Sequence, residues 1–98
     1  MEFDWRIETA LFPGVERQDV EESFEDPFSL RFLPESQSEK VAARYFNLGQ
    51  SGSGTMIFSV YRSNGKSVQI VSSRPMVAHE EAFYHRRMKQ SLDGEARL

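Results

Sequence analysis

Apolar and polar residues alternate with a period of two along much of the segment between residues 44 and 74. Over residues 55–61 the alternation has the spacing of a β-strand with one buried face, and Val68 and Ile70 continue it further along the chain. Between these two runs lies Asn64-Gly65, a pair that favours a type I′ turn with positive φ at both residues. The pattern therefore predicts an antiparallel meander of three strands.

Outside the meander, the pattern predicts two strands and three helices. Alternating apolar residues indicate strands, and apolar residues four apart indicate helices. The predicted strands span residues 1–5 and 28–32, the predicted helices span 6–12, 15–26 and 76–91, and a polar connection spans 35–43. Gly94 is predicted to end the last helix, because glycine commonly follows the final helical turn.

The second predicted helix has a narrow apolar stripe on an otherwise charged surface. Val20 and Phe24 are four residues apart, so they lie on one face of the helix. We expect both side chains to be buried against the sheet. We expect Glu16, Glu21 and Glu25 to be exposed to solvent.

The order of the predicted elements indicates an α+β fold. Four strands follow one another after the two N-terminal helices, and the pattern shows no regular alternation of strand and helix that would favour a parallel sheet. We therefore predict an antiparallel sheet with the helices packed on one face or end. A chain of 98 residues forms one domain, predicted over residues 1–92, with a frayed tail at 93–98.

Composition and charge narrow the function classes. The chain has no cysteine, which excludes disulfides, thiolate catalysis and cysteine-based zinc sites. No apolar run reaches the length of a membrane span and no signal peptide is recognisable, so a cytoplasmic protein without membrane association is expected. Residues 1–49 carry 5 basic and 11 acidic groups, and residues 50–98 carry 7 and 4, so the net charges of the halves are −6 and +3. This asymmetry is compatible with a nucleic-acid face in the second half, but a strong phosphate binder has a denser cluster of lysine and arginine, so the charge argues against tight RNA binding.

A series of short motifs runs in order from residue 1 to about residue 86. The series comprises Phe3-Asp4-Trp5, Gly14-Val15, Phe24-Glu25-Asp26-Pro27, Leu30-Arg31-Phe32, Ser38-Glu39, Arg44-Tyr45, Gly49, Ile70-Val71-Ser72-Ser73-Arg74, Glu80 and Tyr84. This series resembles the BrnT family of type II toxins. The resemblance implies a RelE-like fold and a ribonuclease that needs neither metal nor cofactor. It also implies neutralisation by a BrnA-like antitoxin of the ribbon-helix-helix type.

Two segments depart from the family pattern. Phe12-Pro13 stands where the family has a Lys-His pair, and residues such as Val77 and Glu81 stand where the family has a basic helix start. These replacements remove two polar groups and most of a phosphate-binding cluster. Two functions therefore stay open: a BrnT-like endoribonuclease toxin, and a catalytically degenerate relative that binds a protein partner.

Four residues near the last strand and the last helix are candidates for catalysis. Metal-independent RNA cleavage needs a base, a cation that stabilises the phosphorane and an acid for the leaving oxygen. Arg74, which matches the family arginine, either binds a phosphate or pairs with Glu80; Glu80 is a base, an orienting group or a solvated charge. Tyr84 either stacks on a base or packs its ring on the sheet with its hydroxyl at the rim. His79 is a proton carrier or a surface residue, and its spacing from His85 predicts no metal pair.

Five further cations are candidates for binding RNA. Arg44, Arg62 and Lys66 lie on or beside the predicted meander, where they line a groove or serve solubility. Arg86 and Arg87 lie on the last helix and meet either RNA or an acidic segment of an antitoxin. We expect the protein partner, in a hetero-oligomer, because such an interface tolerates the loss of proton-transfer groups and RNA cleavage does not.

Overall fold

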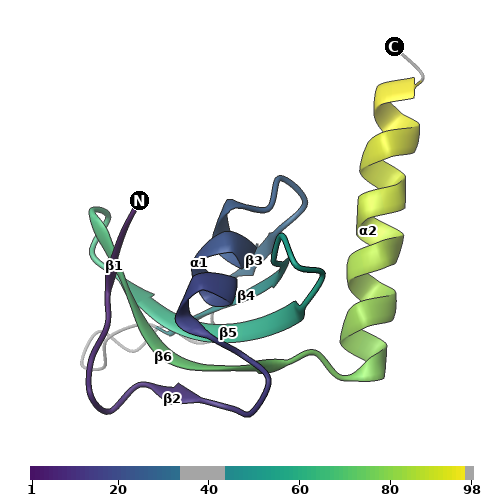
Figure 1. Cartoon of the computed structure of the whole chain (residues 1–98). Coiled ribbons are helices and arrows are strands. Elements are labelled where there is room, and N and C mark those ends of the chain that lie inside the picture. Colours follow the sequence, from purple (N-terminus) through teal and green to yellow (C-terminus); the bar gives the residue numbers. More distant parts are fainter. Residues whose placement is uncertain (34–43, 97–98) are drawn as a thin grey trace.

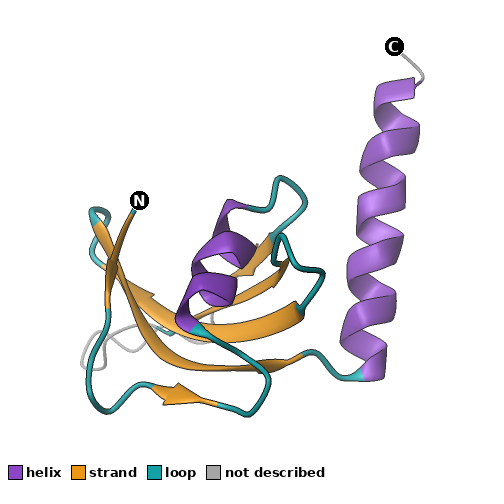
Figure 2. Cartoon of the chain, viewed as in Figure 1, coloured by secondary structure: helices purple, strands orange, loops and turns teal. Residues whose placement is uncertain are grey.

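The computed structural model describes residues 1–33 and 44–96, and within them a six-stranded sheet carries two helices (Figure 1). The elements are β1 (Glu2–Asp4), β2 (Ala10–Leu11), α1 (Arg17–Glu25), β3 (Leu30–Phe32), β4 (Tyr45–Gln50), β5 (Met56–Ser63), β6 (Ser67–Pro75) and α2 (Ala78–Ala96) (Figure 2). The α+β fold class is confirmed. The RelE-like assignment stays a prediction, and the predicted connection at 35–43, with Ser38-Glu39, lies outside the described residues.

The predicted meander is present as β4, β5 and β6, which pair in antiparallel order. Its tight turn contains Asn64-Gly65 but is shifted by one residue: Asn64 and Ser67 close it, so Gly65 and Lys66, rather than Asn64 and Gly65, are its central residues. Glycines alone adopt positive φ in the described residues, so only Gly65, at 89°, does so in this turn. Asn64 instead uses its side chain: its Oδ1 accepts hydrogen bonds from the backbone N–H groups of Lys66 and Ser67, at 2.9 and 2.8 Å. The type I′ prediction is therefore wrong, because the Asn64 side chain supplies the bonds that close the turn.

The sheet is mixed, and the prediction of a purely antiparallel sheet is wrong at one edge. β1 and β2 both pair with β6 in parallel, with Phe3 beside Val68 and Leu11 beside Ser73. Residues 6–12 form a turn followed by β2, so the helix predicted over this range is wrong. Side-chain alternation is the same in parallel and antiparallel strands, so the sequence pattern does not report strand direction.

Helix α1 lies over one face of the sheet and closes the main hydrophobic core (Figure 1). Val20 and Phe24 are 0% and 3% exposed, which confirms their predicted burial. The helix approaches β4 closely at Gly49, where an added Cβ would lie 2.0 Å from the carbonyl oxygen of Ser23. Any larger residue at this position would therefore push α1 off the sheet.

The charged side of α1 is only partly exposed, because Asp19, Glu21 and Glu22 keep intermediate exposure. Glu16 and Glu25 are exposed as predicted, but Glu21 is only partly exposed. Its Oε2 accepts a hydrogen bond of 2.8 Å from the indole Nε1 of Trp5. The predicted exposure of Glu21 is therefore wrong, because its carboxylate accepts the bond from Trp5 and links α1 to the segment that follows β1.

The opposite face of the sheet, which we call the outer face, is defined by the pairing register. Residues directly opposite each other on antiparallel strands point to the same side, so Leu48, Phe58 and Arg74 share this face. Phe46 and Val60 lie on it in the next row. Phe46, Phe58 and Val60 all keep intermediate exposure, so this face is less closed than the face under α1.

Helix α2 stands at one end of the sheet and projects past it (Figure 1). Its first turns contribute Phe83, Tyr84 and Met88 to a second hydrophobic cluster around Leu48 and Met76. The helix continues to Ala96, so the predicted end at Gly94 is wrong and residues 93–96 of the predicted tail are helical. None of the helices that the structure describes is long and apolar enough to cross a membrane.

Candidate functional site

Arg74 and Glu80 form a bidentate ion pair between the end of β6 and the first turn of α2. Arg74 Nη1 and Nη2 donate to Glu80 Oε1 and Oε2 at 2.8 and 2.9 Å. The same carboxylate accepts the backbone N–H of Val77 at 2.9 Å, so it also caps α2. The hydrogen bonds from Arg74 lower the pKa of Glu80, and those to Glu80 raise the pKa of Arg74. Of the two alternatives for Arg74, the structure contains the ion pair.

The Arg74 guanidinium also stacks on an aromatic ring of the outer face. Its Cζ lies 4.2 Å from the ring centroid of Phe58 on the neighbouring strand. The side chain remains 32% exposed, whereas that of Glu80 is 13% exposed. Arg74 is therefore held by contacts on two sides and still presents part of its cation to solvent.

Tyr84 is buried against the sheet and its hydroxyl is not at the rim. The residue is 1% exposed, and its hydroxyl donates a hydrogen bond to Asp26 Oδ2. Burial, assisted by this bond, raises the pKa of Tyr84 well above its ordinary value. Packing of the ring is confirmed, and the predicted rim position of the hydroxyl is wrong. A neutral, buried hydroxyl with a hydrogen-bond partner of this kind contributes to the stability of the fold.

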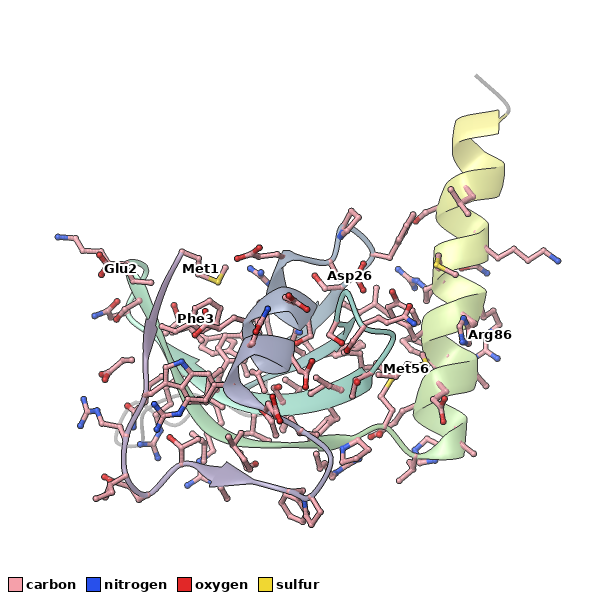
Figure 3. All side chains as sticks on the ribbon, in the orientation of Figure 1. Met1, Glu2, Phe3, Asp26, Met56 and Arg86 are labelled. Carbon is pink, nitrogen blue, oxygen red and sulfur yellow. The ribbon has the colours of Figure 1, made fainter. Side chains whose placement is uncertain are left out.

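Asp26 is a residue that sequence reasoning did not single out as functional, and it joins three elements. Its Oδ1 accepts the N–H of Phe28 and its Oδ2 accepts the N–H of Gln50, both at 2.9 Å. With the bond from Tyr84, the carboxylate connects the end of α1 to β4 and to α2, and Figure 3 shows it on the side that α2 approaches. An aspartate before Pro27 signals a local turn, but partners 24 and 58 residues away leave no local signal.

The predicted cations divide between the two ends of the sheet. Arg86 and Arg87 are exposed on α2, with their guanidinium carbons 5.6 and 6.0 Å from the ring centroid of Phe83. Arg44 and Lys66 are exposed at the end with the β5–β6 turn. Arg62, half-buried on the outer face, lies four residues along β5 from Phe58, or about 13 Å. The structure therefore does not bring all the predicted RNA-binding residues together.

At the α2 end, arginine guanidinium groups lie against the rings of two half-buried phenylalanines. Phe58 and Phe83 pack against the same hydrophobic cluster, and each carries arginine on its ring. We call this group the arginine–phenylalanine cluster, made up of Phe58, Arg74, Phe83, Arg86 and Arg87. His79 is exposed beside it, close enough that its charge contributes to the lowered pKa of Glu80.

The cluster has no metal-binding character. Among the side chains that the structure describes, in residues 1–33 and 44–92, no three histidine, aspartate or glutamate groups come together as metal ligands do. No protein-family model matches this chain, and no curated protein is similar enough to count as a relative. The resemblance to BrnT toxins therefore stays a prediction. A function can be inferred only from the geometry of the arginine–phenylalanine cluster.

Proposed function

We propose that this chain is a BrnT-like toxin component whose arginine–phenylalanine cluster binds an acidic, partly apolar segment of a ribbon-helix-helix antitoxin. One observation carries the proposal. The cations of the cluster are stacked on phenylalanine rings, while the neighbouring groups that resemble catalytic ones are engaged in hydrogen bonds of the fold.

The composition of the cluster suits a protein interface. Arginine and aromatic residues are enriched where protein interfaces concentrate their binding energy. Ring stacking restricts the arginine side chains before binding, which lowers the entropy lost when a carboxylate engages them. Val77 and Leu92, 44% and 47% exposed, add apolar surface before and along α2. An acidic amphipathic segment would complement both features.

A metal-independent endoribonuclease is the second candidate function. Arg74 keeps a third of its side chain exposed, and His79 is exposed next to Glu80, so a cation and a proton carrier lie near one another. However, Glu80 would have to leave Arg74 to act as a base, and Tyr84 would have to leave the core to reach a phosphate. The geometry therefore favours partner binding over cleavage.

Co-expression with the neighbouring open reading frame tests the two candidates together. We expect a ribbon-helix-helix protein encoded there to co-purify with this chain. A long single-stranded RNA incubated with the purified chain in EDTA should remain intact. If the chain cuts the RNA and Arg74→Ala abolishes the cutting, the ribonuclease function is supported. If the ribbon-helix-helix protein does not co-purify, the antitoxin-binding function is rejected.

A further inference from the structure

A hollow of about 660 Å³ opens at the end of the sheet farthest from α2. It lies on the same face as α1 and borders Phe24, which packs edge to face on Tyr61 and lies under the guanidinium of Arg31. Its wall includes the start of β1, and Figure 3 shows Met1 at this end of the molecule. Its described lining consists of Met1, Arg31, Phe32, Leu33, Tyr45, Tyr61, Ser63, Gly65, Lys66, Ser67 and Val68. The volume is in the range of small-ligand sites.

The charge of this hollow is opposite to that of the whole chain. The protein has 15 acidic and 12 basic residues, yet the described lining contains Arg31 and Lys66 and no acidic residue. A second hollow, beside α1, has the reverse character, with Glu22, Glu25 and Asp26 in its lining and no cation among its described residues. The described lining of the first hollow therefore suits an anionic ligand better than a cationic one.

The floor of the first hollow is aromatic. The rings of Tyr45 and Tyr61 stack with their centroids 5.5 Å apart and an interplanar angle of 29°. Tyr61 is buried, whereas Tyr45 keeps intermediate exposure and is the ring that a ligand can reach. Flat rings stack readily on such a surface, whatever their substituents.

Arg31 is fixed beside this floor by its own contacts. Its Nη2 donates to the carbonyl of Phe24 at 3.1 Å, and its Cζ lies 5.6 Å from the ring centroid of Phe24. Its charge acts on Tyr61, where it opposes the rise in pKa that burial causes. The cation is thus placed next to the stacked rings before any ligand arrives.

The rim of the hollow is unusually apolar for an exposed surface. Met1 and Leu33 are 64% and 69% exposed, so two large hydrophobic side chains face solvent around the opening, whereas the ring of Phe32 turns to the outer face and packs on Phe83. Exposed apolar groups beside convergent polar ones are typical of ligand sites. A ligand would remove these side chains from water.

We propose that this hollow binds a nucleoside 5′-phosphate, with the base stacked on Tyr45 and the phosphate paired with Lys66 and Arg31. The aromatic floor favours a flat ring, and the described lining, with two cations and no acidic residue, favours an anionic group. Neither feature involves the arginine–phenylalanine cluster. The proposed nucleotide site is therefore independent of the proposed antitoxin binding, and a test of one does not decide the other.

Isothermal titration of the full chain with 5′-AMP tests this assignment. We expect 5′-AMP to bind roughly tenfold more tightly than adenosine, which lacks the phosphate, or ribose 5-phosphate, which lacks the base. A 5′-phosphorylated adenosine trinucleotide identifies the source of the ligand: tighter binding than 5′-AMP indicates a nucleic-acid end, and equal binding indicates a free nucleotide. Either result agrees with the proposal that the hollow binds a nucleoside 5′-phosphate.

Point variants place the ligand in the hollow. Lys66→Ala changes an exposed residue of a turn, so the chain should fold, and 5′-AMP affinity should fall about fivefold to tenfold. Tyr45→Leu should weaken binding roughly tenfold, whereas Tyr45→Phe, which keeps the ring, should stay within about threefold. Lys89→Ala, at an exposed position of α2, is the matched control and should have no effect.

Three results would overturn the assignment. The first is no heat of binding with millimolar 5′-AMP. The second is 5′-AMP affinity that Lys66→Ala leaves unchanged. The third is tighter binding of laurate, an anion with an apolar chain and no ring, than of 5′-AMP.

Discussion

The two faces of the sheet use polar residues in opposite ways. Under α1, the row Asn47, Ser59 and Ser73 is 0% exposed, and the hydroxyls of Ser59 and Ser73 bond to each other at 2.8 Å. On the outer face, Phe58 and Arg74 are partly exposed and stack on one another. Polar groups directly beneath α1 serve the fold, whereas Arg74 on the outer face remains available to a partner. Beside the two helices, this contrast separates stability from partner binding.

Phe24→Ala should have the largest effect, because it removes a ring from the closed face. Phe24 meets Phe3 and Tyr61 edge to face at 5.5 and 5.0 Å, and the cavity left behind should lower the free energy of unfolding by about 3 to 5 kcal/mol. Phe46→Ala, on the outer face, is the matched control and should cost about 1 to 2 kcal/mol. Urea denaturation measures both. Equal losses would show that the two faces are equally closed.

Tyr84→Phe should have an intermediate effect at the junction of α2 with the sheet. It removes the hydroxyl that donates to Asp26, and the loss of this buried bond should lower the free energy of unfolding by about 1 to 2 kcal/mol. His85→Ala, at the exposed neighbouring position, should change stability by less than about 0.5 kcal/mol. A thermal melt of Tyr84→Phe that coincides with the unaltered protein would show that the Tyr84–Asp26 bond does not stabilise the fold.

Glu80→Gln should reveal a pH dependence on the outer face. Hydrogen bonds from Arg74 hold the pKa of Glu80 below its ordinary value of 4.5, so folding favours the charged carboxylate. This contribution, about 1 kcal/mol, is present above pH 4.5 and is lost as the pH falls through the lower pKa of the folded state. The stability difference between Glu80→Gln and the unaltered protein should therefore shrink between pH 7 and pH 3. A constant difference would contradict the charged pair.

Asn47→Ala should have the smallest effect despite complete burial. Neither Nδ2 nor Oδ1 of Asn47 has a hydrogen-bond partner among the described residues. Removing the amide loses packing but also relieves an unpaired buried polar group, so the net change should stay below about 1 kcal/mol. A much larger loss, measured by urea denaturation, would indicate a buried water that bridges the amide to the sheet.

The sequence predicted the parts of the fold that have a local periodicity. The meander and the burial of Val20 and Phe24 followed from periods of two and four. The parallel pairing of β1 with β6 did not, because strand direction leaves no trace in side-chain alternation. The turn was predicted one residue too early, because the Asn64 side chain accepts hydrogen bonds from Lys66 and Ser67 and moves the central positions to Gly65 and Lys66.

The candidate site was predictable only where its residues are close in sequence. Arg74 and Glu80 are six residues apart, and their pairing was one of two alternatives that the sequence offered. Asp26, by contrast, meets Tyr84 across 58 residues. Such contacts depend on how α1, β4 and α2 meet in space, and that arrangement follows from packing of the whole chain.

Binding of the co-expressed ribbon-helix-helix protein to two charge-reversal variants tests the central claim most directly. Arg86→Glu with Arg87→Glu reverses the charge of the arginine–phenylalanine cluster, whereas Arg17→Glu removes an exposed arginine stacked on Trp5, with its Cζ 5.2 Å from the ring, at the α1 side. We expect the double variant to lose co-purification with the ribbon-helix-helix protein and Arg17→Glu to keep it, with both variant proteins folded. Retention by the double variant, or equal loss in both, would contradict the claim that this cluster is the partner-binding surface.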